Sequence, residues 1–132
     1  MLDGNIPLKH TGYMVEVVVT AEFRTWYEAL SERDQEPVVH AVKLLEEAGI
    51  ALPFPHSSAI AGSKIAMREL RIKSRGKQIR VFYAFDAERQ AVLLIAGNKV
   101  GKKRFYDEMV PRAERLWDEY LAEVSKPTGR TS

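Results

Sequence analysis

The chain contains no cysteine, which excludes disulfide bonds, a thiolate nucleophile and a cysteine-based metal site. It has no apolar run approaching the ~20 residues that span a bilayer. Its opening, MLDGNIPLKHTGYM, lacks the basic start and continuous apolar stretch of a signal peptide. A glycine-rich phosphate loop, a hydrolase triad and histidines at metal-ligand spacing are also missing. These absences predict a soluble cytoplasmic protein that does not act on membranes and binds no metal and no cofactor.

Acidic residues are scarce in two stretches of the chain. Residues 64–80 and 99–104 contain eleven basic residues and one acid, whereas the rest contains nine basic residues and seventeen acids, so the net charge is only +2. A nearly neutral chain that separates its charges in this way should present one basic surface, and such a surface attracts a polyanion such as nucleic acid. An ordinary solvated polar face is the alternative interpretation.

The first half of the chain predicts a strand followed by two helices. The segment MVEVVV (14–19) is short and β-branched, and Thr20 is placed to cap a helix over 21–30. A second helix within 31–50 is indicated by Val38, Val42 and Leu45 at helical spacing, by Pro37 in its first turn and by Gly49 at its end. The prolines of LPFPHS (52–57) then predict a connector.

The second half predicts an antiparallel meander and a final helix. Three strands are expected at about 66–72, 78–85 and 91–98, the last of them central and covered on both faces. The helix is expected to break or restart at Pro111, and its apolar stripe comprises Met109, Ala113, Leu116, Tyr120 and Val124. The prediction is one α+β domain over 14–124, with flexible segments at 1–13 and 125–132.

Side-chain alternation predicts where the basic residues of the meander point. Glu69, Arg71 and Lys73 should share one face of their strand, and Arg80 lies on the mixed face of the next strand. If these faces coincide, Glu69, Arg71 and Arg80 converge on one side of the sheet, directed away from the core. Truncating Arg80 should then change stability only on the surface scale of about ±0.5 kcal/mol.

The ordered series of short motifs in this region resembles the phage-derived HigB-like family, a branch of the RelE-like superfamily of bacterial toxins. No single motif is specific, but their order covers about half of the chain closely and, with the flanking elements, nearly all of it. The series is Leu52-Pro53, Gly62-Ser63-Lys64, Glu69-Leu70-Arg71, Arg80-Val81-Phe82-Tyr83, and the apolar run from Val92 to Ile95 that closes on Lys99.

The resemblance implies a RelE-like α+β fold and the toxin of a type II toxin–antitoxin system. Such a toxin is an endoribonuclease that cleaves mRNA, usually on the ribosome, and is held inactive by a helix-turn-helix antitoxin of the HigA type. The RNA 2′-hydroxyl would attack the neighbouring phosphate, so the protein need not supply a nucleophile or a metal ion. Guanidinium groups suit the remaining tasks of holding the phosphate and neutralising its charge.

Two arginines carry the first catalytic roles that the resemblance implies. Arg80 matches the arginine that stabilises the phosphate, although an edge-strand arginine in a surface ion pair is the plain alternative. Arg71 matches the arginine of the E-L-R motif and would contact the RNA backbone or the scissile phosphate; alternatively it pairs with Glu69 or Glu88. Glu69 is a possible base, but a carboxylate among so many cations should stay ionised, so we favour a partner that orients an arginine.

Lys99 and Tyr106 complete the implied catalytic set. Lys99 follows the central strand, and Tyr106 lies seven residues further on. The alternative for Lys99 is contact with ribosomal RNA without a chemical role, and the alternative for Tyr106 is core packing beside Phe105. The chain departs from the family here, because NKVGKKRFYDEMVP replaces the usual K-T-P-type turn. The remaining cations are predicted to bind RNA phosphates in a salt-dependent manner; they are Lys64, Arg68, Lys73, Arg75, Lys77, Lys102, Lys103 and Arg104.

Histidine is the other candidate for proton transfer, and the chain has three. His10 lies in the expected loose N-terminus, and His40 lies on a predicted helix where a packing or surface role is commoner. His56, in PFPHSS, is the only one close to the basic segment.

Two other functional classes remain open: a non-catalytic RNA- or ribosome-binding module regulated by a partner protein, and a structural protein whose basic surface docks an acidic partner.

Overall fold

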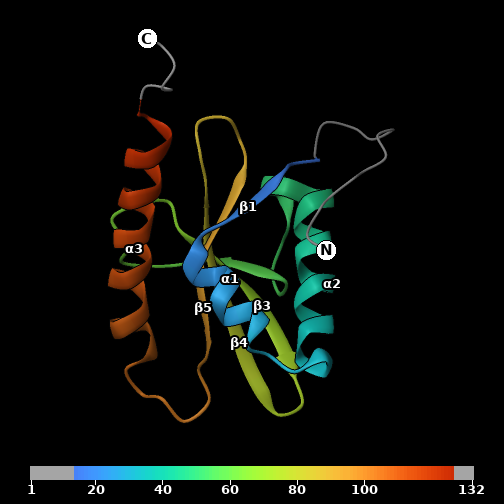
Figure 1. Ribbon diagram of the computed structural model, residues 1–132. Helices are drawn as coiled ribbons and strands as arrows, with labels where there is room; N and C mark the ends of the chain where they lie inside the picture. Colours follow the sequence, from blue (N-terminus) through green and yellow to red (C-terminus); the bar gives the residue numbers. More distant parts are fainter. Residues whose placement is uncertain (1–13, 127–132) are drawn as a thin grey trace.

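The computed structural model describes residues 14–126 (Figure 1). The predicted flexible segment 1–13 and residues 127–132 of the predicted tail lie outside this range. The elements follow the order β1 (Val17–Val19), α1 (Ala21–Glu28), α2 (Glu32–Ala48), the 3₁₀ turn η1 (Gly49–Ala51), β2 (Ser57–Ala59), β3 (Arg68–Ser74), β4 (Lys77–Phe85), β5 (Ala91–Asn98) and α3 (Phe105–Val124). The predicted α+β class, the initial strand-helix-helix unit and the final helix are confirmed.

One five-stranded sheet, in the order β1-β5-β4-β3-β2, forms the middle of the molecule. The predicted antiparallel meander is β3-β4-β5, and β1 adds to β5 in parallel. The sequence does not predict β2, which begins at Ser57, the last residue of the expected connector, and pairs antiparallel with Arg68, Glu69 and Leu70 of β3. A three-residue strand beside two prolines has no periodicity of its own and forms because β3 offers it a partner.

Helices cover both faces of this sheet (Figure 1). Phe23 of α1 and the α2 residues Val38, Val42 and Leu45 pack on one face, which we call the α2 face. On the other, the α3 face, α3 packs against Phe82, Val92, Leu94 and Ile95 among others. The expectation that β5 is covered on both faces is therefore confirmed, since Ala91 to Ala96 are all buried.

The helix ends follow the local signals in the sequence. The side chains of Thr20 and Ser31 accept hydrogen bonds from the amides of Phe23 and Asp34, respectively. Gly49 ends α2 with a φ of 57°, a conformation that glycine adopts without the usual side-chain clash. Pro37 is the sixth residue of α2 rather than part of its first turn, so that detail of the prediction was wrong.

The expected break in the last helix was also wrong, because α3 continues through Pro111 without interruption. Proline removes one backbone donor, but the helix is held to the sheet by buried Met109, Ala113, Leu116 and Trp117 on both sides of it. Val124, expected in the apolar stripe, is 57% exposed. No helix in the described range is both long enough and apolar enough to cross a membrane.

A carboxylate network ties α2 to the hairpin that carries the basic residues. The buried Asp34 carboxylate accepts hydrogen bonds from Lys77 Nζ at 2.7 Å and from Ser74 Oγ at 2.6 Å. These bonds lower the pKa of Asp34 below its ordinary value. A carboxyl with a lowered pKa in the folded state stabilises the fold above its unfolded pKa and loses that contribution as the pH falls through the folded pKa.

We expect Asp34→Asn to lower the thermal unfolding midpoint by several degrees near pH 7, because the ion pair with Lys77 is lost. The difference from the wild type should shrink as the pH falls below about 4, where the wild-type carboxyl itself takes up a proton. Glu36→Gln removes a charge from an exposed position of the same helix and is the matched control. Equal midpoints for the two variants across the pH range would contradict a structural role for the network.

Candidate active site

The Glu69 carboxylate is the centre of a polar cluster on the α3 face. Glu69 Oε1 accepts a hydrogen bond from Tyr106 Oη at 2.7 Å and lies 3.6 Å from Arg80 Nε. Glu69 Oε2 accepts hydrogen bonds from Arg71 Nη1 at 3.3 Å and from Ser58 Oγ at 2.9 Å. The predicted convergence of Glu69, Arg71 and Arg80 is thus confirmed as geometry, and Tyr106 joins them.

Strand register and one close contact bring these residues together. Arg71 on β3 lies directly opposite Arg80 on β4, and Glu69 lies opposite Phe82. Two like charges facing each other across a pair of strands repel, and a shared carboxylate offsets that repulsion. Tyr106 reaches the cluster because α3 approaches β5 closely at Gly97, where a Cβ atom would lie 3.2 Å from the Phe105 ring.

The expectation that this face points away from the core was wrong for Arg80 and Glu69. Each residue is only 4% exposed, and β4 is a central strand rather than an edge. The mixed face of β4 is covered by α3, since Phe82 and Ala84 belong to the core beneath that helix. The alternation of side chains was read correctly, but a second helix layer turned the outer face into an interior one.

A buried charge needs hydrogen-bond partners, and the Arg80 guanidinium has partners for only some of its donors. Its Nη1 donates to the carbonyl oxygen of Ile79 at 3.1 Å, whereas its buried Nε has no hydrogen bond. The ion pair with Glu69 therefore supplies most of its compensation. Arg71 is the more accessible guanidinium, with 31% of its side chain exposed.

The Tyr106 phenol is held in its protonated form. Burial of the ring, together with the hydrogen bond to Glu69, raises the pKa of Tyr106 above its ordinary value, and Arg80 nearby opposes this shift. The Tyr106 ring also packs edge-on against Phe105 and Phe82, so the alternative of core packing beside Phe105 describes part of its role. Lys99 Nζ lies 5.8 Å from the centre of the Tyr106 ring, which brings the fourth predicted residue to the same cluster.

The other predicted RNA-binding cations do not form one surface. Arg68 and Lys77 lie on the α2 face, where Arg68 Nε donates to Ser57 Oγ at 3.0 Å and Lys77 binds Asp34. Lys64 is exposed beside α3, since its amide donates to Glu114 at 2.7 Å. The remaining predicted cations are exposed on the α3 face of β3, in the β3–β4 turn or before α3, and these are Lys73, Arg75, Lys102, Lys103 and Arg104.

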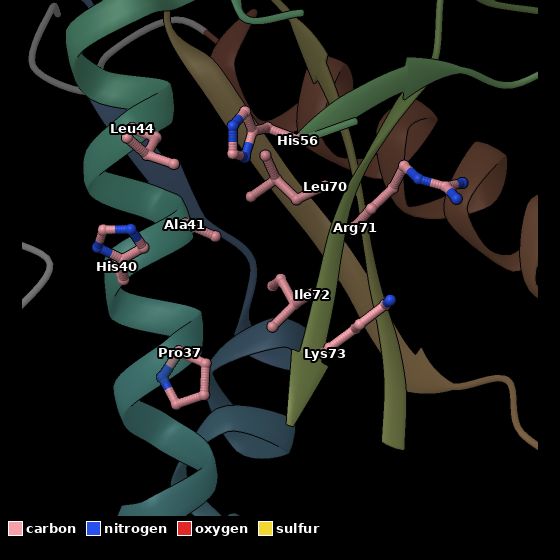
Figure 2. Close-up of a pocket in the computed structure, with 9 residues that line it drawn as sticks. All are labelled: Pro37, His40, Ala41, Leu44, His56, Leu70, Arg71, Ile72 and Lys73. Carbon is pink, nitrogen blue, oxygen red and sulfur yellow. The ribbon is translucent and has the colours of Figure 1, made fainter. Parts of the chain in front are cut away.

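The described histidines lie away from the cluster. Figure 2 shows His40 on α2 and His56 beside a cleft between that helix and β3, whereas Arg71 and Lys73 project from the opposite side of the strand. The cleft has a volume of about 150 Å³, and its floor includes Leu70 and Ile72. His56 is therefore not placed for proton transfer at the cluster, and His10 falls outside the described residues.

Sequence reasoning missed two residues of this neighbourhood. Ser58 belongs to the unpredicted strand β2, and register alone places it opposite Glu69. Phe54 lies under the guanidinium of Arg71, whose Cζ is 5.1 Å from the ring centre. An aromatic residue between two prolines is a visible signal in the sequence, but its distance from Arg71 along the chain hides the contact.

Within residues 14–126 no group of three or more His, Cys, Asp or Glu side chains could hold a metal ion.

Comparison with known proteins gives the family of the chain. The family model described as phage-derived Gp49-like protein (DUF891) matches residues 25–118. A Mycobacterium tuberculosis (strain ATCC 25618 / H37Rv) protein that carries the toxin name HigB2 is 40% identical over 110 residues, covering 80% of this chain and 55% of that protein. Another from the same strain, with the toxin name HigB3, is 36% identical over 108 residues, covering 80% of this chain and 93% of that protein.

The chain therefore spans about half the length of the first relative and nearly all of the second. No solved structure is significantly similar to it. The family model covers most of the chain, including the strands and the helix that carry the Glu69 cluster. The chain thus belongs to the phage-derived Gp49-like family of HigB-like toxins.

Proposed function

We propose that the protein is the toxin of a type II toxin–antitoxin system and that it cleaves mRNA on the ribosome. The observation that supports this function best is the cluster of Arg71, Arg80, Lys99 and Tyr106 around Glu69. Three cations and one carboxylate leave a net positive charge where an anionic phosphate could bind. Family membership supports the toxin role.

The proposed reaction uses groups of the RNA itself. The 2′-oxygen attacks the adjacent phosphorus and loses its proton, the bond from phosphorus to the 5′-oxygen breaks, and that oxygen takes up a proton. The products are a 2′,3′-cyclic phosphate and a 5′-hydroxyl. Charge builds up on the phosphate oxygens in the transition state, and donors fixed in a poorly solvated site stabilise such charge most effectively.

The residues suit different parts of this reaction. Arg71 and Lys99 are the accessible cations and would hold the scissile phosphate. Arg80 lies beneath them, where its buried charge acts through a low-dielectric medium. Glu69 orients both arginines. Tyr106 is protonated at neutral pH, as an ordinary phenol is, and its raised pKa keeps it so; it would donate a hydrogen bond or a proton to an oxygen of the reacting group.

We also propose the partner that this class of toxin requires, a cognate helix-turn-helix antitoxin of the HigA type. The toxin names of the two relatives support an antitoxin partner in general terms. The HigA type, the mRNA substrate and the ribosome come from the resemblance described above. A neighbouring reading frame that encodes a small helix-turn-helix protein would support the assignment.

A non-catalytic RNA- or ribosome-binding module is the second candidate function. It is favoured by the burial of Arg80, whose guanidinium already pairs with Glu69. A module of this kind would bind through its exposed cations and would lose only part of its affinity when any one of them is removed.

Cleavage assays with and without ribosomes test the proposed function. None of the cluster residues is a free base, since Glu69 already accepts from three side chains and Tyr106 is protonated. We therefore expect slow cleavage of free mRNA and faster cleavage on programmed ribosomes. The ratio of the two rates should be about 10²- to 10⁴-fold, the contribution typical of one positioned acid or base.

The control for this assay is Arg71→Ala beside Arg75→Ala, a substitution in the exposed turn. Only the first should abolish the ribosome-dependent rate. Rapid cleavage of free RNA would mean that another residue serves as the base. Absence of cleavage on ribosomes, with binding retained, would favour the binding module.

A further inference from the structure

Phe54 is an exposed aromatic ring held beside the Glu69 cluster. Its exposed fraction is 68%, and it stands between Pro53 and Pro55, which restrict the backbone on both sides. Among the large hydrophobic residues in the described range, only Ile50 is more exposed, at 70%, and it lies four residues earlier, in η1. Ile50 is therefore a suitable control residue, because its side chain is exposed to a similar degree but has no aromatic ring.

The ring is connected to the cluster through one side chain. The Arg71 guanidinium lies over the Phe54 ring, with Cζ 5.1 Å from its centre, and its Nη1 donates to Glu69 at 3.3 Å. A phosphate bound at Arg71 would therefore have an aromatic surface next to it. Bases of single-stranded RNA are attached within one nucleotide of each phosphate, so a bound strand brings a base to this ring.

We propose that Phe54 is a base-stacking residue of the RNA site, accepting the base of a nucleotide next to the phosphate held by Arg71; this rests on the proposed function. Aromatic rings stack on any of the four bases, because each base has a π-face. The contact with Arg71 holds the ring in place through a cation–π interaction while most of its surface stays exposed. Phe54 thus gives affinity for unpaired RNA rather than for a particular base.

The alternative for Phe54 is purely local: the ring only positions Arg71. The two roles differ in whether the effect of removing the ring depends on the presence of a base in the RNA. Stacking requires that base, whereas positioning of Arg71 on a phosphate does not. A cycle that combines a protein variant with an abasic nucleotide separates them.

The experiment uses a short single-stranded RNA made uncleavable by 2′-deoxy substitutions, with 2-aminopurine placed in turn at each position. Stacking on an aromatic ring quenches the fluorescence of 2-aminopurine. We expect the wild type and Phe54→Tyr to quench the probe at one position and Phe54→Ala not to do so. Affinity should fall by roughly 5- to 150-fold in Phe54→Ala and stay unchanged in Ile50→Ala.

The abasic form of the same RNA completes the test. It should bind the wild type as weakly as intact RNA binds Phe54→Ala, and Phe54→Ala should lose nothing further on it. Equal quenching by the wild type and Phe54→Ala, no quenching by the wild type, or the same fold-loss on intact and abasic RNA would each overturn the proposal. Because the probe is uncleavable, these results are independent of whether the protein cuts RNA, which the ribosome assay decides separately.

Discussion

Replacing Arg80 by alanine is expected to slow mRNA cleavage on ribosomes by about 10²- to 10³-fold, the loss typical of one donor that stabilises transition-state charge. The guanidinium is 4% exposed and belongs to the Glu69 cluster, so on the proposed function its charge would act on a phosphate bound there with little screening by water. Ribosome affinity should fall far less, because many exposed cations share it.

The same substitution is also expected to destabilise the fold by about 2–3 kcal/mol, because it leaves the buried Glu69 carboxylate with only the partly exposed Arg71 as a cationic partner. Chemical denaturation of the wild type and Arg80→Ala measures this term. The surface-scale change expected from the sequence does not apply to a side chain enclosed by α3. Loss of cleavage must therefore be separated from loss of folded protein.

Two further variants make that separation. Glu69→Gln combined with Arg80→Ala removes the uncompensated charge, so the double variant should regain part of the stability while cleavage stays lost. Lys73→Ala removes an exposed cation from the same face of β3 and should change both quantities little. A folded Arg80→Ala protein that cuts at the wild-type rate would remove Arg80 from the site, and equal losses in Arg80→Ala and Lys73→Ala would favour the binding module.

Expression of the wild-type protein in a bacterial host is expected to arrest growth and translation, because message cleavage affects every translated gene. Mapping the 5′ ends of cellular mRNAs should show new ends within coding regions. Arg71→Ala should abolish both effects, since it removes the accessible guanidinium of the cluster. Arg115→Ala removes an exposed arginine of α3 that pairs with Glu119 and should remain toxic.

Co-expression of a helix-turn-helix protein from a neighbouring reading frame should restore growth. Unchanged growth with soluble, folded wild-type protein would count against an active toxin. Growth arrest without new 5′ ends would retain toxicity but contradict cleavage, and would indicate binding to RNA or ribosomes as the cause.

Much of the fold follows from local signals that the sequence displays directly. Thr20 and Gly49 mark helix ends, and alternation in RELRIKS and QIRVFYAF gives both strands and their faces. Pairing of Glu69 with Arg71 follows from the same period of two, because residues two apart in a strand share a face. These features depend on neighbours in the chain, so no knowledge of distant contacts was needed.

Features that depend on distant segments could not be predicted in this way. The short strand β2 exists because β3 is available to pair with it, and Pro111 stays helical because the residues around it are anchored to the sheet. A register shift at Phe82 and Tyr83 lets both Leu94 and Ile95 face α3, which the unbroken apolar run of β5 does not reveal. Each is decided by packing energy that local preference does not contain.

The candidate active site likewise combines features that local sequence predicts with features that depend on distant contacts. The sequence by itself determined which residues are charged, which of them share a strand face and which family they resemble. Only the tertiary structure decided that α3 covers this face, burying Arg80 and Glu69, bringing Tyr106 to the carboxylate and separating Arg68 and Lys77 from the cluster. The physical reason is that burial and charge pairing depend on which elements meet across the sheet, and strand periodicity specifies a face without specifying what covers it.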